Sequence, residues 1–325
     1  MVPVALGVPR VGPRCSGDTV PGKEVRASVE LGIITDEVHT DFERACAEVA
    51  GWGLTLAEVR NVNGTNVARL SDDEARSAAA AVRRNGLRVS AVASPVFKSP
   101  LDGRPVDSAA LDFVVPGTET VAAQLELLER SCALARLFET RFVRVFTFLR
   151  VAWSDDVIDQ VIEHMIDAAE IAARNDVVLA VENEPACIVG TGRELGAFFA
   201  RLDAALDPRL RAHVGALWDP GNALSIGEDR PYPGGYDALN VERLVHVHHI
   251  ELLDLHQFLD GVVEGDIEGQ PHFGAVSGNG DGAADAVKAI FGLDTTLGRP
   301  GGDNHHLVTQ PDEFLPQMAD VFSNP

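Results

Sequence analysis

The sequence is poor in basic residues, and this shortage limits its partners. The 325 residues include 27 lysines and arginines against 49 aspartates and glutamates, a formal net charge of −22 at pH 7. A surface this acidic repels phosphate backbones and anionic lipids. We therefore expect no nucleic acid and no membrane as partners, and small molecules remain the expected ligands.

Cysteine is also scarce. The four cysteines, Cys15, Cys46, Cys132 and Cys187, lie far apart and form no CxxC pair. Disulfide frameworks and thiolate zinc sites both need clustered cysteines, so the sequence argues against either and fits a reducing cytoplasm. For Cys187, which lies near a motif described below, we expect the role of a small buried hydrophobic residue.

Long apolar runs are missing as well. No stretch of about 18 uninterrupted apolar residues exists, which argues against a transmembrane helix. Residues 1–28 are rich in Pro, Gly and Val, lack a basic start, and are interrupted by Arg10 and Arg14. We predict a flexible N-terminal arm there rather than a secretory signal. With no linker and no internal repeat in the rest of the chain, residues 29–325 are expected to form one domain.

From residue 30 onward, short β-branched runs alternate with longer amphipathic segments. Amphipathic segments cover 41–53, 71–86 and 121–138, with Gly53 and Gly86 placed where helices should end. Seven strands are predicted, at 31–35, 54–60, 87–94, 141–148, 177–184, 213–219 and 244–250. This alternation indicates a parallel sheet, and seven units favour a single (β/α)8 TIM barrel with its eighth strand after residue 280. An open doubly wound sheet is the alternative, but "GIITDEV" has acids where a phosphate loop needs glycines.

Charged residues gather at the predicted strand ends, where the chemistry of such barrels takes place. Strand alternation points Glu182 inward, puts Asp219 at the end of the next strand, and places His246 and His248 on one face with His248 nearer the rim. A glutamate, an aspartate and a histidine suit Mn²⁺, Mg²⁺, Co²⁺ or Zn²⁺. Each residue alone also fits a salt bridge or a solvated strand end, and Asp219 before Pro-Gly-Asn fits a simple turn.

Several motifs together resemble the sugar phosphate isomerase/epimerase family, the xylose isomerase-like TIM barrels. They are "LGIITDEV", "AEVRNVNGTNV", "ASPVFK", "VRVFTF", "VENEP", "WDPGNAL…GEDRPYPGGYDAL" and "VHVH". The similarity runs from about residue 30 to about residue 250. "WDPGN" followed by "PYPGGY" is its most specific part.

The resemblance implies one divalent metal ion held at the ends of strands five to eight. The matching ligands are Glu182 in "VENEP", Asp219 in "WDPGN" and His248 in "VHVH". The fourth ligand of the family, a glutamate, is absent. Two alignments of the tail are possible: one puts Asp294 in its place, and the other puts Asp303, Asn304 or His305 there. We take Asp294 as the candidate, and the eighth βα unit as divergent.

The resemblance also implies a sugar or polyol substrate and proton abstraction next to a carbonyl, with a metal-stabilised enediolate. Glu182 and Asp294 are then the expected catalytic carboxylates, and Arg60, Lys98, Glu184 and Asn222 the expected substrate-binding residues. A lyase on the same scaffold (a dehydratase or a C-glycoside-cleaving enzyme) and a non-catalytic relative with a degenerate metal site remain alternatives. A homo-oligomer is compatible with each of these functions.

Overall fold

A computed structural model describes residues 30–102, 104–106, 111, 114–248 and 276–277. Seven parallel strands form a curled sheet in which the neighbours follow the order β1, β2, β5, β6, β7, β8 and β9. Their bounds are β1 Glu30–Ile34, β2 Leu56–Val59, β5 Arg88–Val96, β6 Phe142–Val145, β7 Val178–Glu182, β8 Val214–Trp218 and β9 Leu244–Val247. Each begins within two residues of its predicted start and ends within three residues of its predicted end, and the predicted barrel fold is confirmed.

The strand that closes the barrel differs from the expected one. It is β10, Val276–Ser277, which precedes residue 280 and pairs antiparallel with both β1 and β9. Residues 278–325, in which the eighth strand was predicted, lie outside the described residues, as do residues 1–29 with the predicted N-terminal arm.

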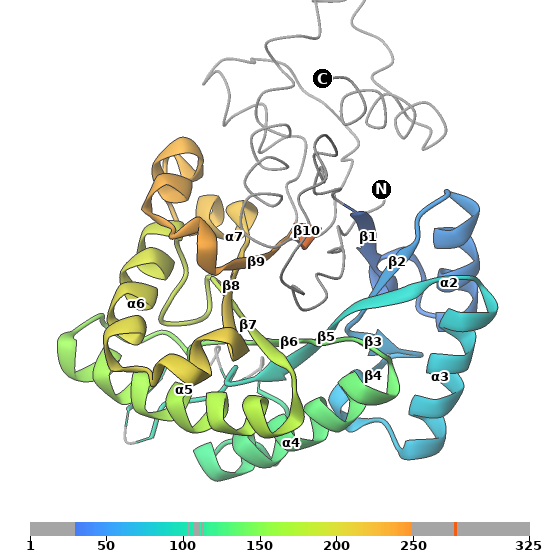
Figure 1. Cartoon of the computed structure of the whole chain (residues 1–325), viewed down its shortest axis with the longest axis horizontal. Helices are drawn as coiled ribbons and strands as arrows, with labels where there is room; N and C mark the ends of the chain where they lie inside the picture. The colour runs from blue at the N-terminus through green and yellow to red at the C-terminus, as the bar shows by residue number, and fades with distance from the viewer. Residues whose placement is uncertain (1–29, 103, 107–110, 112–113, 249–275, 278–325) are drawn as a thin grey trace, which may run out of the picture.

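Helices cover the outside of the sheet, as Figure 1 shows for α2 to α6. Their bounds are α1 Thr35–Val38, α2 Phe42–Gly51, α3 Asp72–Arg84, α4 Val121–Leu137, α5 Asp155–Asn175, α6 Gly192–Ala205 and α7 Pro220–Ser225. Short turns and a two-stranded ribbon complete the described chain: β3 Asn61–Val62, β4 Thr65–Asn66, η1 Val67–Arg69, η3 Pro208–His213, η4 Pro231–Gly235, η5 Tyr236–Ala238 and η6 Val241–Arg243. Among these helices none is long and apolar enough to cross a membrane.

Local sequence explains where the helices begin and end. Ser71 with Glu74 and Thr191 with Glu194 form capping boxes at the starts of α3 and α6, so backbone N–H groups left unpaired there find side-chain acceptors. Gly53 and Gly86, predicted as helix ends, have φ of 79° and 72°, a conformation that glycine adopts without strain.

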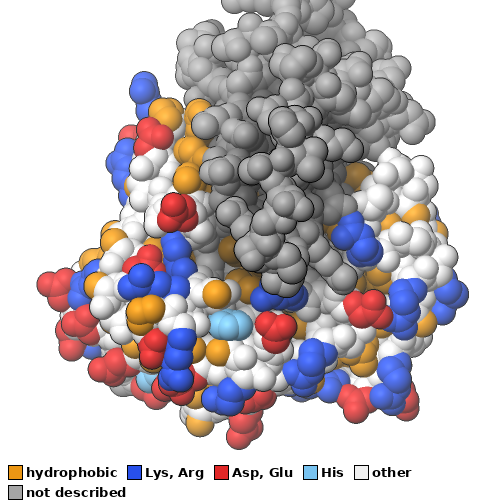
Figure 2. Space-filling model, in the orientation of Figure 1, with side chains coloured by type: hydrophobic (Ala, Val, Ile, Leu, Met, Phe, Trp, Pro, Cys, Tyr) orange, Lys and Arg blue, Asp and Glu red, His pale blue; other side chains and the backbone are white. Residues whose placement is uncertain are grey.

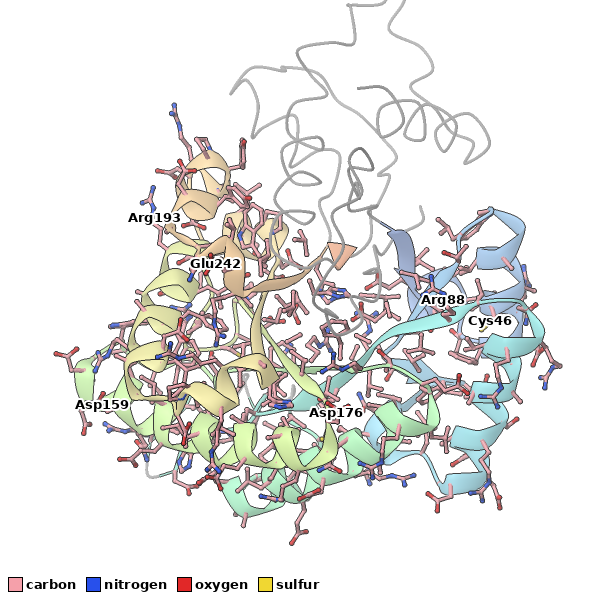
Figure 3. The ribbon with its side chains drawn as sticks, in the orientation of Figure 1. Cys46, Arg88, Asp159, Asp176, Arg193 and Glu242 are labelled. Atoms are coloured by element: carbon pink, nitrogen blue, oxygen red, sulfur yellow. The ribbon has the colours of Figure 1, made fainter. Side chains whose placement is uncertain are left out.

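The interior agrees with a sheet buried on both faces. All five residues of β7 and all five of β8 are buried between helices and barrel interior. Cys46 on α2 (Figure 3), Cys132 and Cys187 are buried free thiols, and burial raises the pKa of Cys46 and of Cys132 to about 12. Cys187 is therefore the buried hydrophobic residue predicted. The outer face drawn in Figure 2 mixes acidic and basic side chains.

Candidate metal centre and substrate cavity

Three predicted ligands meet where β7, β8 and β9 end. Glu182 is the last residue of β7, Asp219 follows β8 directly, and His248 follows β9. All three are buried, and one ligand atom from each lies within 4.8 Å of the others. The barrel therefore brings together three side chains of which the first and the last, Glu182 and His248, are 66 residues apart in the sequence.

Two asparagines fix the position of the carboxylates. The Asp219 backbone N–H donates to the Asn183 side chain at 2.7 Å, and the Asn183 side chain donates back to the Asp219 carbonyl at 2.7 Å. Asn222 donates its backbone N–H to the Asp219 carboxylate at 2.8 Å, and its side chain lies 3.5 Å from Glu182. The turn role considered for Asp219 is thus present, since it caps α7, but Asp219 also lines the cavity.

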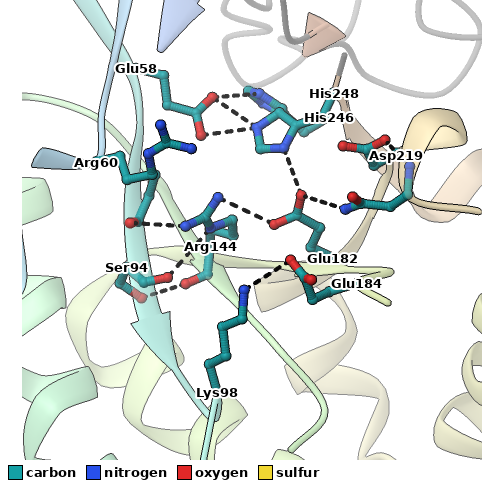
Figure 4. Close-up of polar contacts among 12 residues, drawn as sticks. Glu58, Arg60, Ser94, Lys98, Arg144, Glu182, Glu184, Asp219, His246 and His248 are labelled. Atoms are coloured by element: carbon teal, nitrogen blue, oxygen red, sulfur yellow. Dashed lines mark hydrogen bonds and ion pairs between the residues drawn. The ribbon is translucent and has the colours of Figure 1, made fainter. Parts of the chain in front are cut away.

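His248 lies between two carboxylates, as Figure 4 shows. Its Nδ1 is 2.9 Å from Glu182 Oε1, and its Nε2 is 2.9 and 3.1 Å from the two oxygens of Glu58. Burial by itself lowers the pKa of His248, but the charges of Glu58 and Glu182 outweigh it and raise the value to about 10. An imidazole nitrogen and a carboxylate oxygen this close need a proton or a cation between them, because two lone pairs repel.

The two acidic ligands have opposite pKa shifts. Burial raises the pKa of Asp219, and the charge of Glu182 adds to this, to about 8. Burial acts in the same direction on Glu182, but Arg144, 3.3 Å from its Oε2, and His248 outweigh it and lower the pKa to about 2. A cation bound by these residues would offset the charge of Glu182, which together with burial favours the protonated form of Asp219.

These residues fit a divalent metal ion. Two carboxylates and one imidazole, all buried and converging on one point, form an oxygen-rich donor set that hard or borderline cations prefer. Asp294, Asp303, Asn304 and His305, the candidates for the fourth ligand, lie outside the described residues.

A cavity of about 240 Å³ opens beside the three ligands. All four predicted substrate-binding residues, Arg60, Lys98, Glu184 and Asn222, line it together with Ile34, Glu37, Arg144 and Phe146. The cavity is thus strongly polar, and Phe146 is the only phenylalanine, tyrosine or tryptophan among the described residues that line it.

Each basic side chain among the described residues of the cavity wall forms an ion pair with an acidic side chain. Arg60 contacts Asp36 at 3.1 Å and Glu37 at 2.9 Å, and Lys98 contacts Glu184 at 3.0 Å. Lys98 Nζ also lies 4.9 Å from the centre of the Phe146 ring. These ion pairs restrain the cationic groups at the cavity wall.

The backbone before Lys98 is held in an unusual conformation. Phe97 has φ of 62° and packs against Phe148, φ of 64°, with ring centroids 4.6 Å apart. Bulky residues rarely adopt positive φ, and such strain persists where the surrounding packing enforces it. The buried Phe97–Phe148 pair therefore determines where Lys98 emerges into the cavity.

Three residues of this network were not among the predicted site residues: Glu58, Arg144 and His246. All are buried and come from the strands themselves. A carboxylate at the end of a strand that is otherwise apolar was the available signal for Glu58, and the "VHVH" alternation was the signal for His246. Arg150 contacts Glu194 at 2.9 Å and is not among the described residues that line the cavity.

Solved structures with similar folds share little sequence with this chain. A xylose isomerase-like TIM barrel protein from Mycobacterium smegmatis in complex with magnesium has 19% identity and a TM-score of 0.45, over 67% of this chain and 68% of that one. A probable 3-DHS dehydratase, AsbF, from Bacillus anthracis has 15% identity and a TM-score of 0.49, over 79% and 94%. A D-psicose 3-epimerase has 16% identity and a TM-score of 0.41, over 58% of this chain and 61% of that one.

A search of curated protein sequences finds no match. The family model of the xylose isomerase-like TIM barrel, in contrast, matches residues 46–265, more than half of the sequence. The matched region contains the ends of β7, β8 and β9 with Glu182, Asp219 and His248. The chain belongs to the xylose isomerase-like TIM barrel family.

Proposed function

We propose that this protein is a metal-dependent isomerase or epimerase of a sugar or sugar-like α-hydroxy carbonyl compound. The observation that carries the proposal is the convergence of Glu182, Asp219 and His248 on a cavity lined by cationic and acidic side chains. A buried, polar cavity next to a metal-type donor set is suited to a small ligand rich in oxygen atoms.

In this proposal Glu182, Asp219 and His248 hold one divalent ion, and Asp294 is the candidate for the fourth ligand. The ion, when bound, supplies Lewis-acid polarisation of a carbonyl oxygen, which makes the proton on the neighbouring carbon more acidic. Binding requires the Asp219 carboxyl and the His248 ring to give up protons, since ligands must be deprotonated.

The other cavity residues bind and orient the substrate. Lys98 and Arg60 donate to hydroxyl or acidic groups, while Glu184 accepts from hydroxyls, and their mutual ion pairs restrict the directions in which they point. Proton removal needs a carboxylate within hydrogen-bond reach of the carbon acid. Glu182 is our candidate, with Glu184 at the same wall as the substitute.

A lyase reaction on the same scaffold is the second candidate, and one observation favours it. Glu37 lines the cavity, and burial raises the pKa of its carboxyl, although Arg60 opposes this. A carboxyl with a raised pKa can donate a proton to a departing hydroxyl. β-Elimination of water would then follow the same first step, removal of a proton next to the carbonyl.

The test separates metal binding, proton abstraction and product type. Metal-stripped protein is titrated with Mn²⁺, Mg²⁺, Co²⁺ and Zn²⁺, and the reloaded protein is incubated in D2O with a panel of ketoses, aldoses and hydroxy-keto acids. Deuterium entering the carbon next to the carbonyl, followed by NMR, reports proton abstraction. A rearranged sugar identifies an isomerase or epimerase, and loss of water identifies a lyase.

Glu182→Gln should abolish exchange, whereas Glu228→Gln should retain it. Glu228 is a matched control because it is also a buried carboxylate, but it accepts hydrogen bonds from the backbone at the start of α6. Absence of both metal uptake and exchange would reject both enzymatic proposals and favour a non-catalytic relative.

A further inference from the structure

Glu58 and His246 form a fully buried pair behind the candidate metal centre. Both side chains are 0% exposed, and His246 Nε2 lies 3.0 Å from Glu58 Oε2. Glu58 comes from β2 and His246 from β9, so the contact crosses the barrel interior. Neither residue lines the cavity, whereas His248, which contacts Glu58, does.

The hydrogen bonds of Glu58 determine which nitrogens carry hydrogen. A carboxylate only accepts, and its partners here are Nε2 of His246 and Nε2 of His248. Both rings must therefore carry a hydrogen on Nε2. In His248 the other nitrogen, Nδ1, then remains for the contact with Glu182 Oε1 at 2.9 Å. Nδ1 is thus the ring atom presented to the three-ligand group.

Two groups of possible ligands share His248, and their surroundings distinguish them. Glu182, Asp219 and His248 line the cavity, so an ion there is reachable by substrate. In the group of Glu58, His246 and His248, only His248 lines the cavity. One His248 nitrogen faces each group. The buried pair of Glu58 and His246 is therefore suited to orienting the His248 ring, whereas Glu182 and Asp219, which line the cavity, are suited to holding the ion together with His248.

We propose that Glu58 is a positioning residue that orients His248 and sets its tautomer for metal binding through Nδ1, and that His246 holds Glu58 in place. This inference rests on the metal site of the proposed function. A carboxylate that accepts the second N–H of a ligating histidine fixes the ring and makes it a better ligand, and its loss typically weakens metal affinity roughly 10- to 100-fold.

The experiment compares Co²⁺ and Mn²⁺ binding by calorimetry in wild-type protein and in Glu58→Gln, Glu58→Asp and Glu228→Gln. The Gln side chain is neutral and has an NH2 donor in place of one acceptor oxygen, so the charge is lost and a single oxygen remains to accept from the two rings. We expect the dissociation constant to rise roughly 10- to 100-fold in Glu58→Gln, less in Glu58→Asp, and to be unchanged in Glu228→Gln.

The visible spectrum of the Co²⁺ protein gives a readout independent of activity. It should change in Glu58→Gln, because the His248 ring moves or ligates differently, and stay unchanged in Glu228→Gln. Circular dichroism of the metal-free variants checks that each is folded. If Glu58→Gln does not fold, Glu58→Asp tests whether Glu58 orients His248. Equal affinity and an unchanged spectrum in a folded Glu58 variant would overturn the inference. Absence of metal binding by the wild type would instead reject the proposed function.

Discussion

Replacing Asp219 by asparagine should change how the stability of the metal-free protein depends on pH. The Asp219 carboxyl is 7% exposed, and burial beside Glu182 raises its pKa from 3.8 to about 8. Between these values the folded state keeps a proton that the unfolded state has lost, so the free energy of unfolding falls as pH rises and levels off above the folded pKa. Asparagine does not titrate and can still accept the hydrogen bond from the Asn222 N–H.

The magnitude follows from the linkage relation. Between pH 6 and pH 8, ionisation of a carboxyl with a folded pKa of about 8 lowers the free energy of unfolding by about 2 kcal/mol. The stability of Asp219→Asn relative to wild type should therefore increase by this amount over the same interval. Groups far from Asp219 that titrate in this range are common to both proteins and cancel in the difference.

Urea unfolding of chelator-treated protein at pH 6, 7 and 8 measures this difference. Excess Mn²⁺ should shift the difference in favour of the wild type, because the wild type gains about 2.7 kcal/mol at a metal concentration 100 times the dissociation constant and the variant gains less. If the two stability curves run parallel from pH 6 to pH 8 without metal, Asp219 ionises normally and the electrostatic account of the site is wrong.

Four further substitutions test the charge of the site and the packing of the helices around the sheet. Arg144→Met leaves the buried Glu182 carboxylate without its 3.3 Å partner and should cost about 3 kcal/mol of unfolding free energy, measured in urea. Gly196→Ala places a Cβ against the carbonyl at the end of η5 and should cost roughly 2 kcal/mol, whereas Gly51→Ala, with no atom within 4 Å, should stabilise slightly. Lys98→Met should raise KM roughly tenfold and change kcat less, since it removes a charged binding contact at the cavity wall; an unchanged KM would place the substrate elsewhere.

The candidate site residues that lie at the ends of strands could be predicted from the sequence. Glu182 and Asp219 come at the ends of two consecutive apolar runs, and in a parallel barrel such ends meet at one rim. Alternation also put His248 on their side, and the structure brings all three within ligand distance. The fourth ligand could not be predicted in the same way, because Asp294 follows no motif that aligns uniquely.

The contact of His248 with Glu58 could not be predicted from the sequence. Glu58 precedes it by 190 residues, and His246 and Glu58 lie on strands that do not pair with each other. Nothing in the local pattern of β2 distinguishes a carboxylate that reaches across the barrel from one that faces solvent.

The sequence by itself thus determined the order of strands and helices, their caps, and the rim at which the acidic and imidazole side chains of the candidate site gather. These depend on periodicity, capping residues and chain direction, which are local properties. Only the tertiary structure decided that Glu58 buries its charge between His246 and His248, and that Arg144 balances Glu182. The reason is physical: contacts across a closed sheet depend on its curvature and register, and charged side chains persist in such an interior when paired.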